Sequence, residues 1–552
     1  MRLIFGVSKA IRKIREPEKV CYLGYNFSNQ LKLIKSGFNV IDIKNIISDT
    51  AHSIKYKFID YIADIGKKQK RKLEWWASSI ASKSNLQTDF FANTCLLFAF
   101  SKIKEDNICS TIVVDDMKVY YLLKANYKFD TFHLSDIIAI IDSGFKKIYY
   151  YFKVATSRLK FILYRLNYNR NIKNIFTNFN GRNVYVYSWV EDRSFNSNGN
   201  YSDPYFPGIY EFNYKSRFIT FCSYYVKKHL FKNFSDEVFL DGLPNYSSIK
   251  KIIFSCFHFF RPKMIDSFCN LNLYPLWDYE ILSENSSSGY IAKIHDYYCW
   301  EDFFRSASGL FIYPYENQPW EKVMIQAANK VECNVKLVGC LHTTVHRLLL
   351  AFHTTKNEIS YMPTPGLLVV NSEYTKNLYN EYYKHSSVKI INGGSLRFSS
   401  SVAVPLRQNS KVPTVGVMLS CVPSQTYEQL NDLKSNNNAK FIYLVKMHPD
   451  LPIKQGSLSK NIKFYTKSAL ELYHSVDGII YCSSTSGMEA YSLGLPVFRL
   501  LTQYLDLETG EDSFFPNIIK SISEISESDL VRHEPIQLFS PVNEKVWMDI
   551  LS

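Results

Sequence analysis

Two short polar segments near the C-terminus have residue types that suit phosphate binding. KMHP (446–449) follows the apolar run FIYLV, and SSTSG (483–487) follows DGIIYC, so each comes directly after a predicted buried strand. The second segment also begins a predicted helix, whose first backbone N–H groups have no partner within the helix and attract anions. Lys446 and His448 add positive charge at the end of the neighbouring strand. The pair therefore predicts a nucleotide-sugar site in which His448 stabilises the departing nucleotide.

The hydroxyl groups of the second segment outnumber what a helix start requires. One side-chain oxygen is enough for an N-cap. We therefore expect the four hydroxyl residues to contact the donor: Ser483, Ser484, Thr485 and Ser486. Glu489, one turn into the helix, is expected to accept hydrogen bonds from ribose hydroxyls. The alternatives are ordinary capping by a single serine and compensation of the helix dipole by Glu489.

Acidic and basic residues follow three strands in the middle of the chain. Glu316 stands between the strand FIYPY and Pro319, a residue that suits the first turn of a helix. We predict Glu316 to be the general base that deprotonates an acceptor hydroxyl, with helix charge compensation as the alternative. Glu321 lies in the opening turns of that helix, where a structural or acceptor-positioning role is expected. His342 and Arg397 follow later strands and are expected to contact a phosphate or the acceptor.

The elements that must position these residues alternate between strand and helix patterns, which predicts the α/β class with parallel sheets. A polar, proline-flanked stretch at 395–412 interrupts the series. We therefore predict an N-terminal α/β region at 1–175, an acceptor-side Rossmann-like domain at 176–400 and a nucleotide-sugar-binding Rossmann-like domain at 401–552. Residues 70–100 are helical in pattern. Ligands of such sheets bind beyond the carboxyl ends of the strands, so a cleft is expected between the two domains.

Composition narrows the class of protein. Hydrophobic residues make up 46% of the 552 residues, which excludes a disordered chain. The net charge of +14 is spread along the chain without a nucleic-acid-binding motif, so no nucleic-acid partner is expected. The 11 cysteines form no C-x-x-C pair, which favours a reducing, cytoplasmic location and argues against structural zinc. No metal ion is expected, because Asp115 and Asp116 lack partner ligands and read as a helix start.

One segment has a different character. In residues 144–174, Lys and Arg alternate with Tyr, Phe, Leu and Ile, and acidic residues are absent. The pattern predicts a basic amphipathic helix on an anionic membrane surface, which would make the protein peripheral at the inner face of the cytoplasmic membrane. The alternative is a solvated helix that links two domains. No run of 18 or more apolar residues occurs, so no membrane-spanning helix is predicted.

The motifs resemble a known group of proteins. KMHP followed by SSTSGMEAYSLGLPV resembles the HP and Ser/Thr motifs of bacterial GT-B transferases that use CMP-activated sugars, namely sialyl-, polysialyl- and capsular Kdo transferases. The segments IYPYENQPWEKVMIQAAN, VKLVGCLHTTV and EWWASSIASKSNL resemble surface carbohydrate (O-antigen and capsule) biosynthesis proteins of about 600 residues. The resemblance implies that His448, Ser483 and Ser484 hold the CMP phosphate. The family's base belongs to an acidic-acidic-Gly motif, whereas this chain has Glu316-Asn317-Gln318.

The resemblance implies a GT-B-like glycosyltransferase that inverts the sugar configuration without a metal requirement. The expected donor is a nucleotide sugar, with a CMP-linked ulosonic acid as the candidate, and the expected acceptor is a glycan or lipid-linked glycan. No separate cofactor is expected. The alternatives are a sugar-nucleotide 2-epimerase or polyol-phosphate transferase of the same architecture, or a non-catalytic scaffold of a polysaccharide assembly complex.

Overall fold

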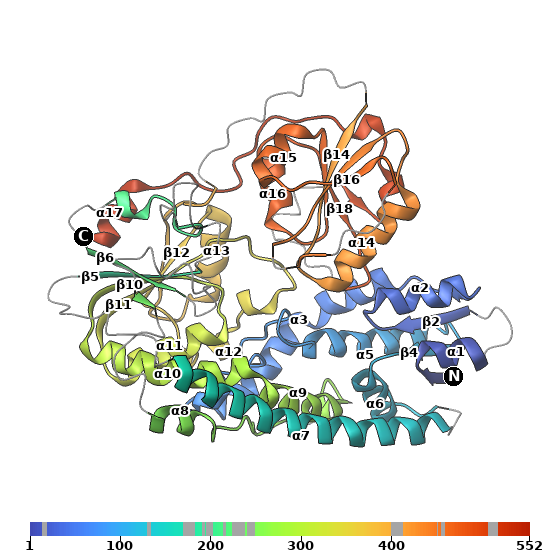
Figure 1. The fold of residues 1–552 in the computed structure, drawn as a ribbon, viewed down its shortest axis with the longest axis horizontal. Helices are drawn as coiled ribbons and strands as arrows, with labels where there is room; N and C mark the ends of the chain where they lie inside the picture. Colours follow the sequence, from blue (N-terminus) through green and yellow to red (C-terminus); the bar gives the residue numbers. More distant parts are fainter. Residues whose placement is uncertain are drawn as a thin grey trace.

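The computed structural model describes most of the chain and shows three parallel sheets surrounded by helices (Figure 1). The described residues are 1–13, 19–129, 134–168, 183–189, 194, 203–212, 217–222, 238–239, 249–265, 267–398, 412–449, 451–453, 459–505 and 517–552. A two-stranded hairpin, β8 (Ser267–Phe268) with β9 (Leu271–Asn272), completes the strand inventory of these residues.

The C-terminal sheet has six parallel strands in the order β16-β15-β14-β17-β18-β19. Numbered along the chain, this is the 3-2-1-4-5-6 order of a Rossmann fold. Strands β14, β17 and β18 are buried along their whole length, as expected for parallel strands covered by helices on both faces. The strands are β14 (Thr414–Met418), β15 (Ile442–Lys446), β16 (Ile462–Phe464), β17 (Gly478–Tyr481), β18 (Val497–Leu500) and β19 (Ile518–Ile519); the helices are α14 (Pro423–Asn436), α15 (Ala469–Ser475) and α16 (Thr485–Ser492).

The central sheet has seven parallel strands in the order β13-β12-β11-β10-β5-β6-β7. This is again a Rossmann-type order, extended by one strand, with the reversal between β5 and β10. The strands are β5 (Asn183–Ser188), β6 (Arg217–Cys222), β7 (Val238–Phe239), β10 (Ser308–Pro314), β11 (Asn334–Cys340), β12 (Leu367–Val370) and β13 (Lys389–Asn392); the helices are α11 (Pro319–Lys330), α12 (Lys356–Ile359) and α13 (Glu373–Tyr382).

A smaller parallel sheet, in the order β1-β4-β2-β3, forms the N-terminal region. Its helix α2 lies beside α14 of the C-terminal sheet, and the long helix α3 packs against α5 and α12 (Figure 1). The strands are β1 (Arg2–Phe5), β2 (Lys19–Leu23), β3 (Asn39–Val40) and β4 (Thr111–Val114); the helices are α1 (Val7–Lys13), α2 (Phe27–Lys35), α3 (Lys44–Lys67), α4 (Leu73–Trp76), α5 (Phe90–Glu105) and α6 (Met117–Asn126).

A layer of helices joins the N-terminal region to the central sheet. The 35-residue helix α7 (Leu134–Tyr168) runs along the outer edge of this layer and packs on α8 (Ile249–Ser255), α9 (Tyr274–Ser286) and α10 (Ser288–Ser306) (Figure 1). One buried hydrophobic cluster continues from the N-terminal helices through α9 and α10 to the central sheet. Packing therefore crosses the predicted domain boundary at residue 175, and the boundary itself stays a prediction.

The C-terminal helix α17 (Glu544–Leu551) leaves the C-terminal sheet and packs on the central domain. Its Trp547 indole donates a hydrogen bond to the Gly393 carbonyl at 2.9 Å and stacks on Phe212 at 6.4 Å between ring centroids. The chain thus crosses twice between the two Rossmann-like domains. The predicted junction at 395–412 lies mostly outside the described residues.

The predicted fold class is confirmed: the protein is α/β, with two Rossmann-like domains in a GT-B-like pair and an extra N-terminal α/β region. The helix expected over 70–100 is wrong in detail, because turns separate α4 from α5. Within them Lys83 has a positive φ of 56° and forms a buried ion pair with Glu358 at 2.5 Å, a tertiary contact that overrides local propensity. Among the described residues, no helix is both long and apolar enough to cross a bilayer.

Candidate functional site

The carboxyl ends of the two large sheets meet at a threonine contact. Thr485 begins α16, directly after β17, and its hydroxyl lies 3.0 Å from that of Thr343 and 3.3 Å from that of Thr344. Both partners lie in the loop that follows β11 of the central sheet. The ligand-binding edges of the two domains therefore face each other, as a site shared between them requires.

Glu316 and His342 form a pair at the carboxyl edge of the central sheet. Their strands, β10 and β11, are neighbours, and the Glu316 Oε1 atom lies 3.3 Å from the His342 Nε2 atom. The Glu316 side chain is 30% exposed, whereas that of His342 is 6% exposed and meets Tyr205 edge to face at 5.0 Å. The carboxylate is thus accessible and is oriented by the imidazole, which suits a general base.

Glu321 is buried within the turn that presents Glu316. Its Oε1 atom accepts hydrogen bonds from the backbone N–H groups of Glu316 at 2.9 Å and Gln318 at 2.8 Å, which closes a capping box at the start of α11. Burial raises the pKa of the Glu321 carboxyl and lowers the pKa of the adjacent Lys322 ammonium. Asn317, which follows Glu316 in the chain, adopts a positive φ of 58°. These contacts fit a structural role in holding the Glu316 loop.

The hydroxyls of residues 483–486 take up separate positions. Ser483 is buried and donates to Gln425 Oε1 at 2.6 Å, with the Ser420 hydroxyl 3.1 Å away. Ser484 is the N-cap of α16 and accepts from the backbone N–H of Ser486 at 3.2 Å, which is the ordinary capping role. Thr485 makes the contact between the domains. The start of α16, rather than a row of hydroxyls, is the feature that suits an anion.

Lys446 ends β15 and His448 follows it at the same edge of the C-terminal sheet, two strand positions away from the start of α16. Their strand β15 and the strand β17 both flank β14, so two strand spacings, roughly 10 Å, separate the two segments. The Lys446 ammonium donates to the backbone carbonyl of Lys467, beyond β16, and thus points away from α16. His448 is half-buried. The structure therefore places His448 and the start of α16 at the same edge of the sheet, two strands apart.

Glu489 and Arg397 border a common small pocket beside α16. Glu489 accepts a hydrogen bond from the Tyr473 hydroxyl at 2.9 Å. Burial raises the pKa of the Glu489 carboxyl, whereas the Tyr473 hydrogen bond and the charge of Arg397 act to lower it. Arg397 also lies over the Phe398 ring at 5.1 Å. Arg397 thus brings a positive charge from the central domain close to Glu489 of α16.

The sequence interpretation did not find Ser420, Gln425 and Tyr473. Ser420 could have been found, because it follows the strand β14 as Ser483 follows β17. Gln425 and Tyr473 lie within helices α14 and α15, where no local signal separates them from ordinary helix residues. All three contact the 483–489 segment: Ser420 from the loop after β14, Gln425 from α14 and Tyr473 from α15.

No family model matches the chain, and no curated protein matches it. Solved structures that resemble it include the calicheamicin glycosyltransferase CalG4 (11% identity, 58% of this chain and 80% of that chain, TM-score 0.35). The glycosyltransferase SnogD from Streptomyces nogalater is 10% identical over 67% of this chain and 94% of that chain, with a TM-score of 0.34. The wall teichoic acid polymerase TagF is 12% identical over 73% of this chain and 91% of that chain, with a TM-score of 0.32. The fold assignment rests on the strand order of the two large sheets.

Proposed function

We propose that the protein is a glycosyltransferase of surface polysaccharide biosynthesis that transfers a sugar from a nucleotide donor to a glycan or lipid-linked acceptor. The observation that carries the proposal is the contact of Thr485 with Thr343 and Thr344, which brings two ligand-binding sheet edges together. One edge carries a carboxylate–imidazole pair, and the other carries a helix start with His448 nearby. A CMP-linked ulosonic acid is the donor that the sequence motifs favour.

The proposed reaction is a single displacement with inversion. The acceptor hydroxyl oxygen attacks the anomeric carbon while the bond from that carbon to the phosphate oxygen breaks. Glu316 takes the hydroxyl proton, and His342 holds the carboxylate in place. The nucleotide leaves with its electron pair, and the positive end of the α16 dipole together with His448 stabilises the new charge without a metal ion. Lys446 joins them only by giving up its bond to the Lys467 carbonyl.

A transfer assay tests this reaction. The purified chain is incubated with labelled CMP-, UDP-, GDP- and CDP-activated sugars and with lipid-linked glycan acceptors, and products are separated by chromatography. Transfer from one donor class, lost in Glu316→Gln and kept in Glu373→Gln, supports the proposal. Glu373 is an exposed carboxylate of the same domain, paired with Lys376 and Asn392, and serves as the matched control. Epimerised donor or transferred polyol phosphate without sugar transfer contradicts it, as does an inactive chain that still supports polysaccharide assembly.

We further propose that helix α7 rests on an anionic membrane surface, where a lipid-linked acceptor would be found. Exposed apolar side chains form a stripe on the side of α7 opposite its buried residues, and α8 with its following loop adds further apolar side chains. Exposed basic residues flank them. This apolar surface comprises Phe145, Ile148, Tyr149, Phe152, Leu159, Leu163, Phe254 and Phe257, with Lys153, Lys160, Lys250, Arg261 and Lys263 around it.

The occupant follows from this composition. Apolar side chains ringed by cations match the acyl chains and anionic headgroups of a leaflet. Co-sedimentation with phosphatidylglycerol vesicles, compared with phosphatidylcholine vesicles, measures this binding. Phe152→Glu should reduce binding to the anionic vesicles at least tenfold, whereas Val531→Glu, at a side chain equally exposed in the C-terminal region, should not. Equal binding by both variants would contradict the membrane proposal.

A further inference from the structure

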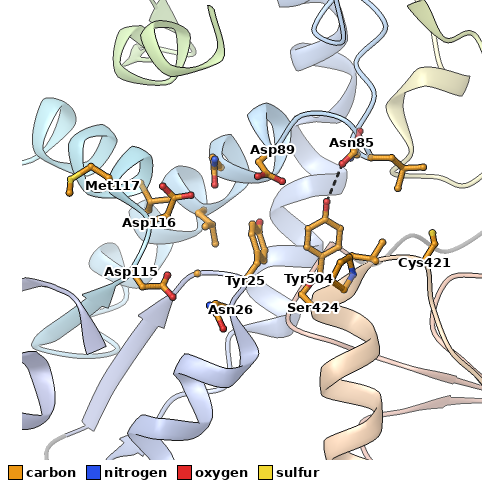
Figure 2. Close-up of a pocket in the computed structure, with 17 residues that line it drawn as sticks. Tyr25, Asn26, Asn85, Asp89, Asp115, Asp116, Met117, Cys421, Ser424 and Tyr504 are labelled. Atoms are coloured by element: carbon orange, nitrogen blue, oxygen red, sulfur yellow. Dashed lines mark hydrogen bonds between the residues drawn. The ribbon is translucent and has the colours of Figure 1, made fainter. Parts of the chain in front are cut away.

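A second cavity lies between the N-terminal sheet and the C-terminal sheet, away from the Glu316–His342 pair (Figure 2). It has a volume of about 730 Å³, within the usual range of roughly 300–1,000 Å³ for small-molecule sites. Gly24 follows β2 and Asp115 follows β4, so the cavity stands at the carboxyl edge of the N-terminal sheet. The opposite wall is Tyr504 and the start of α14 at Pro423 and Ser424.

The two walls are joined by several contacts. The Lys44 ammonium pairs with Glu428 of α14 at 2.6 Å and donates to the Leu501 carbonyl at 3.2 Å. The Tyr504 hydroxyl donates to the Asn85 carbonyl at 3.4 Å (Figure 2). The Tyr504 ring meets Tyr25 edge to face at 5.0 Å. The cavity is therefore a built feature of the fold, since charged and aromatic contacts set the distance between its walls.

The wall chemistry is acidic and polar. Asp89, Asp115 and Asp116 border the cavity, and none of the described residues that border it is Lys, Arg or His. Asp116 caps α6 through the Lys118 backbone N–H at 2.7 Å, as the sequence predicts for a helix start. Asp115 accepts from the Tyr22 hydroxyl and from Asn29 Nδ2, both at 2.6 Å and both through Oδ2. In a chain of net charge +14, this local acidity disfavours phosphate and carboxylate ligands.

Asn93 supplies an independent sign of a ligand. Its side chain borders the same cavity and is 2% exposed, and its Nδ2 atom is buried without a hydrogen-bond partner. A buried donor left unpaired is destabilising, so native proteins seldom keep one without a reason. The Nδ2 atom is covered in this structure, so a ligand oxygen in the cavity would satisfy it once the Asn93 side chain turns its amide toward the cavity.

We propose that this cavity binds a neutral or amino sugar unit, which under the proposed function belongs to the acceptor glycan. Sugar hydroxyls donate to carboxylates and accept from amides, so Asp89, Asp115 and Asn93 match both roles of a hydroxyl-rich ring. The apolar C–H groups of the ring pack on Tyr25 or Tyr504. The part of this inference that concerns the acceptor rests on the proposed function, whereas binding of a sugar does not.

Two other ligand classes fit the cavity less well. A nucleotide would bring phosphate charge against three carboxylates. For a metal ion, the described residues offer a close group of three ligand side chains at His295, Asp296 and Cys299 on α10 and none at this cavity. The described carboxylates at the cavity thus do not form a close group of three ligands for one cation.

Saturation-transfer NMR on the full chain, without nucleotide, tests the proposal. The probes are glucose, galactose, N-acetylglucosamine and glucosamine, with glucuronate and N-acetylneuraminate as anionic probes. At least one neutral or amino sugar should bind at least tenfold more tightly than either anionic sugar. Asp89→Asn and Asn93→Leu should each weaken that binding at least tenfold. Asn436→Ala, at the far end of α14, is the matched control and should bind as the wild type does.

Thermal unfolding separates loss of a ligand contact from loss of fold. Because Asn93 Nδ2 has no partner, Asn93→Leu should leave the Tm unchanged or raise it while sugar binding falls. The proposal is overturned if no neutral or amino sugar binds, if both variants bind normally, or if Ca²⁺ alone binds and is lost in Asp89→Asn. If the protein binds a sugar in this cavity but transfers no sugar from any donor, the proposed function is contradicted and the proposed sugar site is still supported.

Discussion

Two sheet edges in this molecule follow one topological rule and differ in chemistry. At the junction of the two large sheets, the edge with the α16 start and His448 faces the edge with the Glu316–His342 pair, and Arg397 of the central domain lies beside α16. At the N-terminal sheet, three aspartates and two tyrosines border a cavity whose described lining holds no cation. Parallel strands create a ligand-binding edge in both places. Under the proposed function, side-chain charge decides which part of the reaction each edge serves.

We infer from this difference that the two edges bind different parts of the substrates: the donor nucleotide at the junction and a sugar unit of the acceptor at the acidic cavity. Donor phosphate needs positive potential. The junction has cations beside the start of α16, whereas the helix starts at the cavity lie among three aspartates. Sugar hydroxyls need acceptors, donors and aromatic surface, which the acidic cavity offers. A protein with both edges can hold an anionic donor and an uncharged acceptor unit without either competing for the other's place. Four predictions, in order of expected size, test this contrast.

The largest effect is expected at the Glu316–His342 pair. Glu316→Gln should lower sugar transfer roughly 10²- to 10⁴-fold, because a positioned general base contributes about that much. Nucleotide binding, followed by thermal shift, should stay within twofold, since the amide keeps the shape of the side chain. Initial-rate measurements with labelled donor check the prediction. Near wild-type turnover in this variant would show that Glu316 is not the general base.

The second effect concerns the segment that borders the acidic cavity. Lys83 and Glu358 form a buried ion pair, with exposed fractions of 0% and 2%, that anchors the turns between α4 and α5. Lys83→Met should cost about 3–5 kcal/mol of unfolding free energy, because it leaves a buried carboxylate unpaired. Urea denaturation measures the loss. The double variant Lys83→Met/Glu358→Leu should recover most of it, and an equal loss in both would show that the charge pairing is not the cause.

Much of the junction could be predicted from the sequence, and the acidic cavity could not. Glu316, His342, His448 and Ser483 each follow a strand that can be recognised from its apolar run. Parallel topology places the residues that follow such strands at one edge of the sheet. Distances across the edge are set by strand order, which put β14 between His448 and Ser483. The prediction that all four hydroxyls of residues 483–486 contact the donor did not foresee that Ser484 caps α16 and that Ser483 binds Gln425.

The cavity depends on contacts over long stretches of chain. Asn93, Asp115 and Tyr504 come together only because the C-terminal sheet packs on the N-terminal region. No spacing in the sequence relates these residues. The local pattern at Asp115 and Asp116 predicts a helix start, and Asp116 is indeed the N-cap of α6. The break in the predicted helix over 70–100 has the same origin, since the Lys83–Glu358 pair forms across 275 residues.

A smaller effect is expected at the α16 start. Ser484→Ala removes the N-cap and should cost about 1 kcal/mol of unfolding free energy. It should also weaken nucleotide binding, because a frayed first turn presents its N–H groups less well. Ser526→Ala, which removes a cap from a short 3₁₀ turn at the surface, is the control and should leave nucleotide binding unchanged. Unchanged binding in Ser484→Ala would argue against an anion at this helix.

The smallest effect is a pH dependence at the acidic cavity. Asp89 is exposed to the cavity, and partial desolvation there raises its pKa above 3.8 against the opposing charge of Lys118. The native state therefore holds the Asp89 proton to higher pH than the unfolded chain does, and solvent screening keeps the effect on stability small. Stability from this group is present below pH 3.8 and is lost as pH rises through the raised pKa. Asp89→Asn should therefore gain Tm relative to the wild type between pH 3.5 and pH 7. A constant difference across this range would contradict the raised pKa.

The contrast between the two edges is tested most directly by nucleotide thermal shift in three proteins: wild type, His448→Ala and Asn93→Leu. Each is melted with and without CMP, UDP, GDP and CDP, because stabilisation follows ligand affinity. The account predicts that one nucleotide stabilises the wild type and Asn93→Leu equally and that His448→Ala loses most of that shift. A shift that survives in His448→Ala and disappears in Asn93→Leu would place the nucleotide at the acidic cavity and contradict the account.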